Sequence, residues 1–388
     1  MLLLLLVASL TTTTTPCWGF VLRPPPPRFS MVSFAEDAIG AWVGSADLEV
    51  GTKVMVNDVN DGISLSAIFW TTVEELLREA KNEASQAVLV FSRGESPLAA
   101  WVDYVASLDI RGLEISCRDD APCPTLLARV EPEMASDLLE IDASGSVPTM
   151  QRWVQDVIVD TKVCPFTASP TVAGSGLADV QPGAIGYPTC AAVGSSDAAL
   201  VVLMSTFWST AVDLLNAPPE DLSTLLLCAP HFAPRDHDAF ARMTACLVKN
   251  LKLVQADHLL SLVFFHPLYD RSRIHPPDAM THGHLPPEPW LPSYLRLAHS
   301  EEEIANLTKD QLKRANYQRR APFTVINVLR SDQVEKAETV VPWELIEPEP
   351  GRRVRVSGAR VYAQNTWRLA TKSQQRTDPD TGHLYLAG

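Results

Sequence analysis

Several features that would assign this sequence to a functional class are missing from it. Its seven cysteines form no CxxC pair, which favours reduced thiols over a disulfide framework. The formal net charge of -14 argues against a nucleic-acid-binding protein, because such proteins need a basic face. The apolar run at residues 1–10 is too short to span a bilayer, so no mature membrane span is expected. Gly174-Ser-Gly176 lacks the Gly-Lys-Ser/Thr continuation of a P-loop and predicts a plain loop.

What is present has the composition of an ordinary globular protein, with 46% hydrophobic and 20% charged residues. A chain of 388 residues exceeds the usual single core, so two domains are expected. The C-terminal extension, 341–388, is basic between residues 351 and 376. Its Arg353-Val-Arg355-Val alternation predicts an edge strand, and an arm that docks an acidic partner is the alternative.

The first 30 residues predict a targeting presequence. An apolar stretch at 1–10 is followed by a basic, proline-rich stretch, and no acidic residue precedes Glu36. With Phe20 at the junction, the segment resembles the bipartite presequence of proteins imported into secondary plastids. The resemblance implies the plastid stroma, and a secretory signal with a flexible linker is the alternative.

An internal repeat is indicated by two segments 138 residues apart. Phe69-Trp70 and the helical pattern after it resemble Phe207-Trp208 and its own continuation, and weaker matches follow in the same order. We therefore expect a degenerate repeat at 31–145 and a second repeat at 146–340, packed together as a pseudo-dimer. Residues 267–320 are extra in the second repeat.

Each repeat predicts alternating strands and helices, which together form an α/β layer sandwich. In the second repeat we expect strands at 199–204, 224–229, 259–265 and 323–329, and helices at 151–159, 207–215, 238–250 and 332–338. Within this proline- and histidine-rich insert, residues 275–314 are expected to be mostly irregular, with at most one helix near 301–315. His282-Gly-His284 lies in this loop, and no metal site is expected there.

The second repeat also carries motifs. Val163-Cys164-Pro165-Phe166, Phe265-His266-Pro267-Leu-Tyr269 and the run from Asn316 through Arg319-Arg320 to Phe323 follow one another in order. They resemble the family of domains of unknown function numbered fourteen-fifteen, found in bacteria and plastids, over about 151–340. The family's separate His-Pro pair is reversed here, as Pro230-His231. The resemblance implies domain limits and localisation but no reaction.

The first functional hypothesis is an enzyme that acts on a small anionic metabolite. A thiol at Cys164 paired with the imidazole of His266 could act as a nucleophile, with His231 assisting. Arg320 and Arg319 could bind the anion, with Tyr269 and Asn316 beside them.

The second hypothesis is a non-catalytic binding or assembly module of the plastid, in which the same residues hold loops together. Convergence of Cys164, His266 and Arg320 in one pocket would favour the enzyme. The sequence identifies no cofactor.

Overall fold

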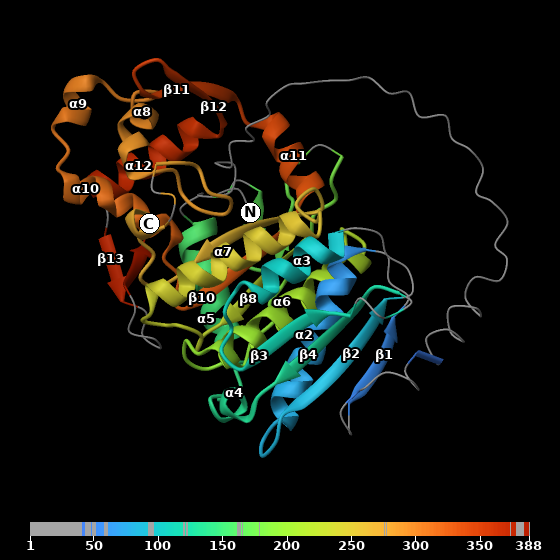
Figure 1. Ribbon diagram of the computed structural model, residues 1–388. Helices are drawn as coiled ribbons and strands as arrows, with labels where there is room; N and C mark the ends of the chain where they lie inside the picture. Colours follow the sequence, from blue (N-terminus) through green and yellow to red (C-terminus); the bar gives the residue numbers. More distant parts are fainter. Residues whose placement is uncertain are drawn as a thin grey trace, which may run out of the picture.

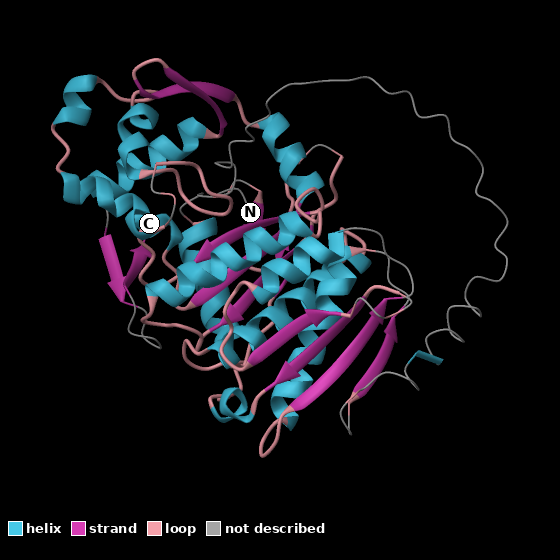
Figure 2. Ribbon diagram, viewed as in Figure 1, coloured by secondary structure: helices cyan, strands magenta, loops and turns pink. Residues whose placement is uncertain are grey.

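The computed structural model of the protein describes residues 41–42, 48, 52–57, 61–91, 97–118, 121, 123–160, 164, 166–177, 179–274, 276, 278–372, 374–377 and 384–387. Within them the chain is a mixed α/β protein, as the alternating pattern predicts (Figures 1 and 2). The predicted presequence lies outside the described residues.

The first half of the chain builds a four-stranded sheet in the spatial order β1-β2-β4-β3. β1 and β2 are parallel, and the other two pairings are antiparallel. Its elements are β1 (Lys53–Asn57), α2 (Gly62–Glu79), β2 (Ser85–Phe91), α3 (Pro97–Ala106), β3 (Leu113–Cys117), β4 (Thr125–Val130) and α4 (Pro132–Ser136).

The second half builds a six-stranded sheet in the order β5-β6-β7-β8-β10-β9. β7 and β8 are parallel, and β10 is antiparallel to both β8 and β9. Its elements are α5 (Ser146–Trp153), the π-helix η1 (Val154–Val159), β5 (Thr167–Ser169), β6 (Val172–Ala173), β7 (Gly183–Gly186), α6 (Asp197–Asn216), β8 (Thr224–Ala229), α7 (His237–Leu253), β9 (Leu260–Phe265), β10 (Thr324–Arg330) and α11 (Ser331–Val340).

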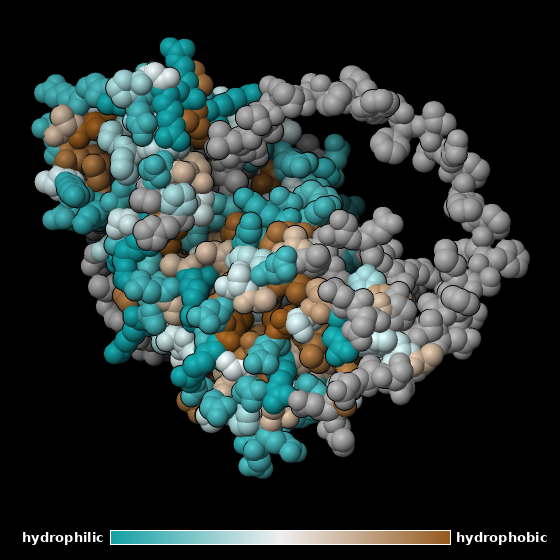
Figure 3. Space-filling model, in the orientation of Figure 1, coloured by the Kyte–Doolittle hydropathy of each residue, from teal (hydrophilic) through white to brown (hydrophobic). Residues whose placement is uncertain are grey.

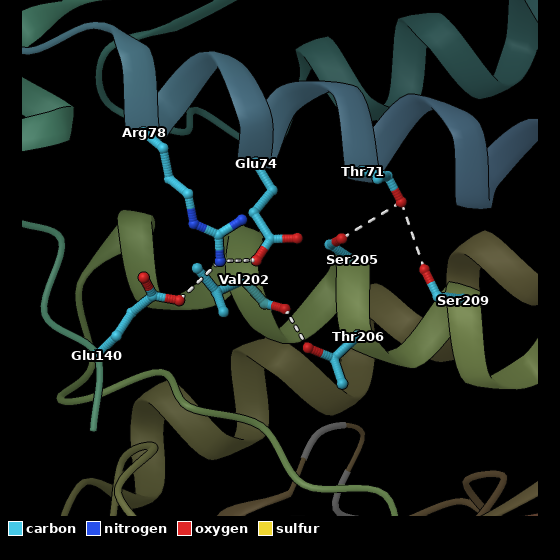
Figure 4. Close-up of polar contacts among 8 residues, drawn as sticks. All are labelled: Thr71, Glu74, Arg78, Glu140, Val202, Ser205, Thr206 and Ser209. Atoms are coloured by element: carbon cyan, nitrogen blue, oxygen red, sulfur yellow. Dashed lines mark hydrogen bonds and ion pairs between the residues drawn. The ribbon is translucent and has the colours of Figure 1, made fainter. Parts of the chain in front are cut away.

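The order β7-β8-β10-β9 repeats the order and the strand directions of β1-β2-β4-β3. Helices α2 and α6, which precede the matching strands β2 and β8, pack against each other. At their contact the hydroxyls of Thr71 and Ser209, 138 residues apart, lie 3.3 Å from each other (Figure 4). In a two-fold arrangement a residue on the axis meets its own equivalent. The pseudo-dimer and the duplication behind it both stay predictions.

One hydrophobic cluster joins the two halves. It contains apolar residues of α2, α3, α6 and α7 together with one face of each sheet, so the helices form a layer between the two sheets. The outer face of the six-stranded sheet is covered by α5 and η1. Their apolar side chains, Trp153 of α5 among them, form a second hydrophobic cluster with residues of the sheet such as Phe265. Side-chain caps from Asp61, Ser196 and Asp236 begin the three long helices α2, α6 and α7.

The predicted strand at 199–204 is wrong, because these residues belong to the 20-residue helix α6. α6 is apolar on almost every side, since its partners include both α2 and β8. By length and composition it could cross a membrane, but 67% of its apolar window is buried inside the protein. The strand that pairs with β8 in parallel is instead the glycine-rich β7.

The insert is more regular than expected. It contains η2 (Arg271–Arg273), η3 (Glu288–Trp290), α8 (Leu291–Leu295), α9 (Glu301–Ala305), α10 (Lys309–Lys313) and η4 (Arg314–Arg319). The expectation of at most one helix is therefore wrong. Capping boxes formed by Ser300 with Glu303 and by Thr308 with Gln311 begin α9 and α10.

The C-terminal extension forms the antiparallel pair β11 (Trp343–Glu349) and β12 (Arg352–Ser357), the helix α12 (Ala359–Lys372), and the strands β13 (Gln374–Thr377) and β14 (Leu384–Ala387). Hydrophilic residues predominate around β11 and β12 in Figure 3. Arg360 pairs with Glu344 at 2.8 Å, and the Arg355 guanidinium lies over the Trp343 ring. These basic groups thus have partners within the chain, and docking of an acidic partner stays a prediction.

Candidate functional site

A pocket lies between η1 and the outer face of the six-stranded sheet. Its empty volume of about 440 Å³ includes open solvent at its mouth, so the pocket is only partly enclosed. π-Helical turns are rare in proteins, and those that occur often lie at functional sites. The pocket is lined by Trp153, Val154, Ile158, Cys164, Thr167, Ile185, Thr224, Leu226, Val263, Phe265 and Asn327. Among these described lining residues none is charged, so the pocket suits an uncharged molecule.

Cys164 is the predicted site residue that the pocket contains. Its side chain is 2% exposed, and its Sγ accepts a hydrogen bond from the Thr167 hydroxyl at 3.2 Å. Trp153 forms the adjoining wall, with its ring edge-on to Phe265 at 5.3 Å between centroids. The Trp153 indole donates to the backbone carbonyl of Arg320, which fixes its orientation.

Two polar side chains lie side by side in the pocket lining. Thr224 begins β8, and its hydroxyl lies 2.8 Å from both the Asn327 Oδ1 and the Val328 carbonyl. Asn327 is central in β10 and is 5% exposed. Among the described residues, the Nδ2 group of Asn327 has no hydrogen-bond partner. The residue is buried, but Nδ2 itself keeps some solvent contact, so it is a donor available to water or to a ligand.

The four-stranded sheet has no such polar group at the matching position. Asn327 lies opposite Leu226 in the β8–β10 ladder, and Leu127 lies opposite Val88 in the β2–β4 ladder. An apolar residue therefore suffices for this place in the fold. The amide of Asn327 is better explained by the pocket than by the sheet.

His266 lies on the opposite side of the six-stranded sheet from Cys164. Side chains alternate along a strand, and Phe265 packs in the cluster of Cys164. The His266 ring instead stacks on Phe240 of α7, with 4.6 Å between centroids. The predicted pairing of the Cys164 thiol with the His266 imidazole is therefore wrong.

Both ring nitrogens of His266 contact backbone groups. Nε2 lies 2.8 Å from the Ala233 carbonyl, and Nδ1 accepts from the Leu268 amide at 3.1 Å. These contacts assign Nε2 as the protonated nitrogen, because a carbonyl can only accept. The ring is fully buried and holds two loops together. Nearby His231 contributes its backbone carbonyl, which accepts from the Gly194 amide, and its side chain does not line the pocket.

The predicted anion-binding arginines also serve the loops that follow β9 and precede β10. Arg320 lies over the Tyr317 ring at 4.2 Å and donates from Nε to the Tyr269 carbonyl. Arg319 is 1% exposed, and burial lowers its pKa to about 10, although Tyr269 and Tyr362 partly oppose that shift. Neither arginine lines the pocket. Cys164, His266 and Arg320 therefore do not converge in the pocket, the arrangement that would have favoured the enzyme.

Tyr269 and Asn316 join the same buried network. The Tyr269 hydroxyl accepts from the Leu285 amide at 3.0 Å and lies 3.2 Å from His284 Nδ1. The Oδ1 of Asn316 accepts from the Arg271 amide, and its Nδ2 donates to Asp270 and to Glu288. The motif residues after Phe265 thus hold the insert onto the sheet.

The insert covers the edge strand β9 of the six-stranded sheet, and a neutral histidine makes one of the contacts. The outward-facing amide of Leu262 in β9 donates to His282 Nε2 at 3.0 Å, and the next outward amide, from Phe264, donates to the Gly283 carbonyl. An imidazole nitrogen can accept only when it is unprotonated. Burial, with a smaller contribution from Lys252, lowers the pKa of His282 to about 4.

We expect His282 to make stability depend on pH. Below pH 6.5 the unfolded state binds a proton that the folded state does not, so stability falls as the pH drops from 6.5 toward 4. The slope from one such group is about 1.4 kcal/mol per pH unit. The variant His282→Gln keeps an acceptor for Leu262 but cannot titrate. Urea denaturation at pH 7.5, 6 and 5 should show a shallower loss in the variant, and equal slopes would contradict the assignment.

The sequence also carries a signal for the two polar pocket residues that lie outside its motifs. Thr224 and Asn327 are polar residues inside segments that otherwise have the apolar pattern of buried strands. Their adjacency depends on the β8–β10 pairing across a long insert. In the described part of the chain, no group of three or more His, Cys, Asp or Glu residues could hold a metal ion.

Comparison with known proteins agrees with the motif resemblance. Residues 146–305 match the model of a family described as protein of unknown function, DUF1415. The match begins at the first residue of α5 and includes η1, Cys164, β8 and the Phe265-His266 motif. No curated protein and no solved structure matches the chain.

Proposed function

We propose that the protein is a binding module for a small, uncharged and largely apolar molecule, held in the pocket beneath η1. The observation that carries the proposal is the Nδ2 donor of Asn327, which has no partner among the described residues and lies in an otherwise mainly apolar pocket. Ligand pockets combine apolar walls with a few polar groups that orient the ligand. A donor at Nδ2 calls for an acceptor on the ligand, such as a carbonyl oxygen.

The separation of the expected catalytic residues favours the binding module over the Cys/His-dependent enzyme. The His266 imidazole is engaged by backbone on the other side of the sheet. An anionic metabolite is also disfavoured as the ligand, since Arg319 and Arg320 lie outside the pocket lining. The free-energy cost of burying an unpaired charge there would exceed the stabilisation that the pocket's apolar contacts could provide.

We expect Asn327→Leu to weaken binding of a simple ketone such as acetophenone roughly two- to tenfold, equivalent to one net hydrogen bond of about 0.5–1.5 kcal/mol. The variant should fold, because the Thr224 hydroxyl keeps its contact with the Val328 carbonyl. Calorimetric titration or saturation-transfer NMR would measure the change.

A matched control is Leu127→Asn, which places an amide at the same register position of the other sheet. It should leave ketone binding unchanged. Binding that is absent in the wild type, or equal in wild type and Asn327→Leu, would refute the assignment of the pocket.

We also propose that the two halves arose by duplication and that the first half serves as a scaffold. Besides the shared strand order, contacts at equivalent positions of the two halves support this. Trp42 packs on β2 as Trp153 packs on β8, and Arg118 lies over the Trp42 ring much as Phe265 lies against Trp153. The scaffold half has Leu127 where the binding half has Asn327.

The proposed setting is the plastid. The support is the composition of residues 1–30, an apolar stretch followed by a basic stretch with Phe20 at their junction. Import of a fluorescent fusion of residues 1–40 into plastids would test this localisation, and secretion of the fusion would contradict it.

A further inference from the structure

Cys164 differs from the other buried cysteines by its place in the pocket. Cys190, Cys228 and Cys246 lie outside the pocket lining, and burial raises the pKa of each, to about 11 for Cys190 and to about 12 for Cys246. Cys164 instead lines the pocket and has the Thr167 hydroxyl 3.2 Å from its Sγ. A hydrogen bond donated to sulfur stabilises negative charge as it develops there.

A second, independent group in the same pocket points to a ligand. The amide of Asn327 is more than nine-tenths buried, lines the pocket, and has no partner for Nδ2 among the described residues. A donor fixed in a water-poor site stabilises charge that develops on a carbonyl oxygen. Thiol and donor together match a ligand that has an electrophilic carbon conjugated to a carbonyl.

We infer that the ligand is an α,β-unsaturated ketone or aldehyde, and that Cys164 captures it covalently while Asn327 binds its carbonyl oxygen. This rests on the proposed binding function and names the ligand class for the same pocket. The apolar walls hold the hydrocarbon part of the ligand, and the absence of charge among the described lining residues suits a neutral electrophile.

The chemical step is a conjugate addition. The sulfur–carbon bond forms at the β-carbon, the carbon–carbon π bond breaks, and its electron pair moves through the α-carbon onto the carbonyl oxygen as an enolate. Nδ2 of Asn327 donates to that oxygen. The thiol proton passes through solvent and ends on the α-carbon, so the step needs no oxidant and no reductant.

The experiment uses the full chain with cyclohex-2-en-1-one as the electrophile and cyclohexanone as its saturated analogue. Peptide mass spectrometry should find an adduct on Cys164 with the mass of the intact reagent. The rate at Cys164 should saturate with reagent concentration, because binding precedes reaction. The exposed Cys117 serves as internal control, and its rate should stay linear.

Cyclohexanone should protect Cys164 and leave Cys117 unaffected, a test that needs no variant. Asn327→Leu should slow the reaction at Cys164 at least tenfold at low reagent concentration. Cys164→Ser should lose the adduct and still bind cyclohexanone.

The possible failures are distinguishable. If cyclohexanone binds but Cys164 reacts no faster than Cys117, with a linear rate, covalent capture is overturned and the binding function stands. If cyclohexanone neither binds nor protects Cys164, the proposed function fails as well.

Discussion

Replacing Arg271 with methionine should lower the free energy of unfolding by about 3–5 kcal/mol, because several buried carbonyls lose their donor at once. The Arg271 side chain is 1% exposed, and its guanidinium donates to four backbone carbonyls. They belong to Ile274, Pro276, Ala279 and Leu285. Methionine fills a similar volume but leaves these carbonyls without their donor, and each unsatisfied group costs about 1–3 kcal/mol.

Arg273 offers a matched control only two residues away. Its salt bridge with Asp238 is on the surface, with the two side chains 47% and 84% exposed. Arg273→Met should therefore change stability by less than about 0.5 kcal/mol. Urea denaturation monitored by far-UV circular dichroism would measure both. A cost below about 1 kcal/mol for Arg271→Met would mean that water replaces the guanidinium at these carbonyls.

Arg271 also explains why the insert is more ordered than its sequence predicts. Prolines are typical of turns and loops, and the local pattern between 274 and 290 gives no periodic signal. The insert is ordered by the Arg271 side chain, which donates to several of its backbone carbonyls. It is also ordered by the hydrogen bonds that His282 and Gly283 accept from the edge of β9. Both contacts join segments through tertiary structure, which local sequence patterns do not record.

The error at 199–204 has a different cause. A run such as Leu200-Val-Val-Leu203 is apolar and contains β-branched residues, which favours a buried strand. α6 is buried by a helix on one side and a sheet on another, so it lacks the polar face that marks most helices. The true strand β7 is Gly-Ala-Ile-Gly, too short and too rich in glycine to be recognised.

The candidate site was predicted in part. The sequence singled out Cys164 by its motif, and the structure places it in the pocket. The alternation of side chains along β9 could have predicted that Phe265 and His266 lie on opposite faces of the sheet. Which of these two faces Cys164 lies on depends on how the chain after η1 packs, and the sequence does not show that. Asn327, to which we assign the polar contact with the ligand, is a polar residue within the apolar strand β10.

Trp70→Ala and Trp208→Ala should each cost about 3–5 kcal/mol, the range for removing a buried aromatic side chain. Both tryptophans are fully buried, and each lies edge-on to the phenylalanine before it, at 5.1 Å for Phe69 and 5.0 Å for Phe207. Since α2 and α6 occupy matching places on either side of one contact, the two costs should be similar. Among the described residues neither indole nitrogen has a hydrogen-bond partner. Phenylalanine at these positions should therefore cost less than alanine.

The two variants also test whether the halves unfold together. Trp70 and Trp208 belong to one hydrophobic cluster that includes both sheets, so each substitution should shift a single transition in guanidinium denaturation. Trp343→Ala, at a partly exposed position on β11, is the control and should shift it much less. Fluorescence and circular dichroism should give the same midpoint. Two transitions, with Trp70→Ala moving only one of them, would instead mean that the halves are separate folding units. The α2–α6 contact would then resemble an interface between domains more than a shared core.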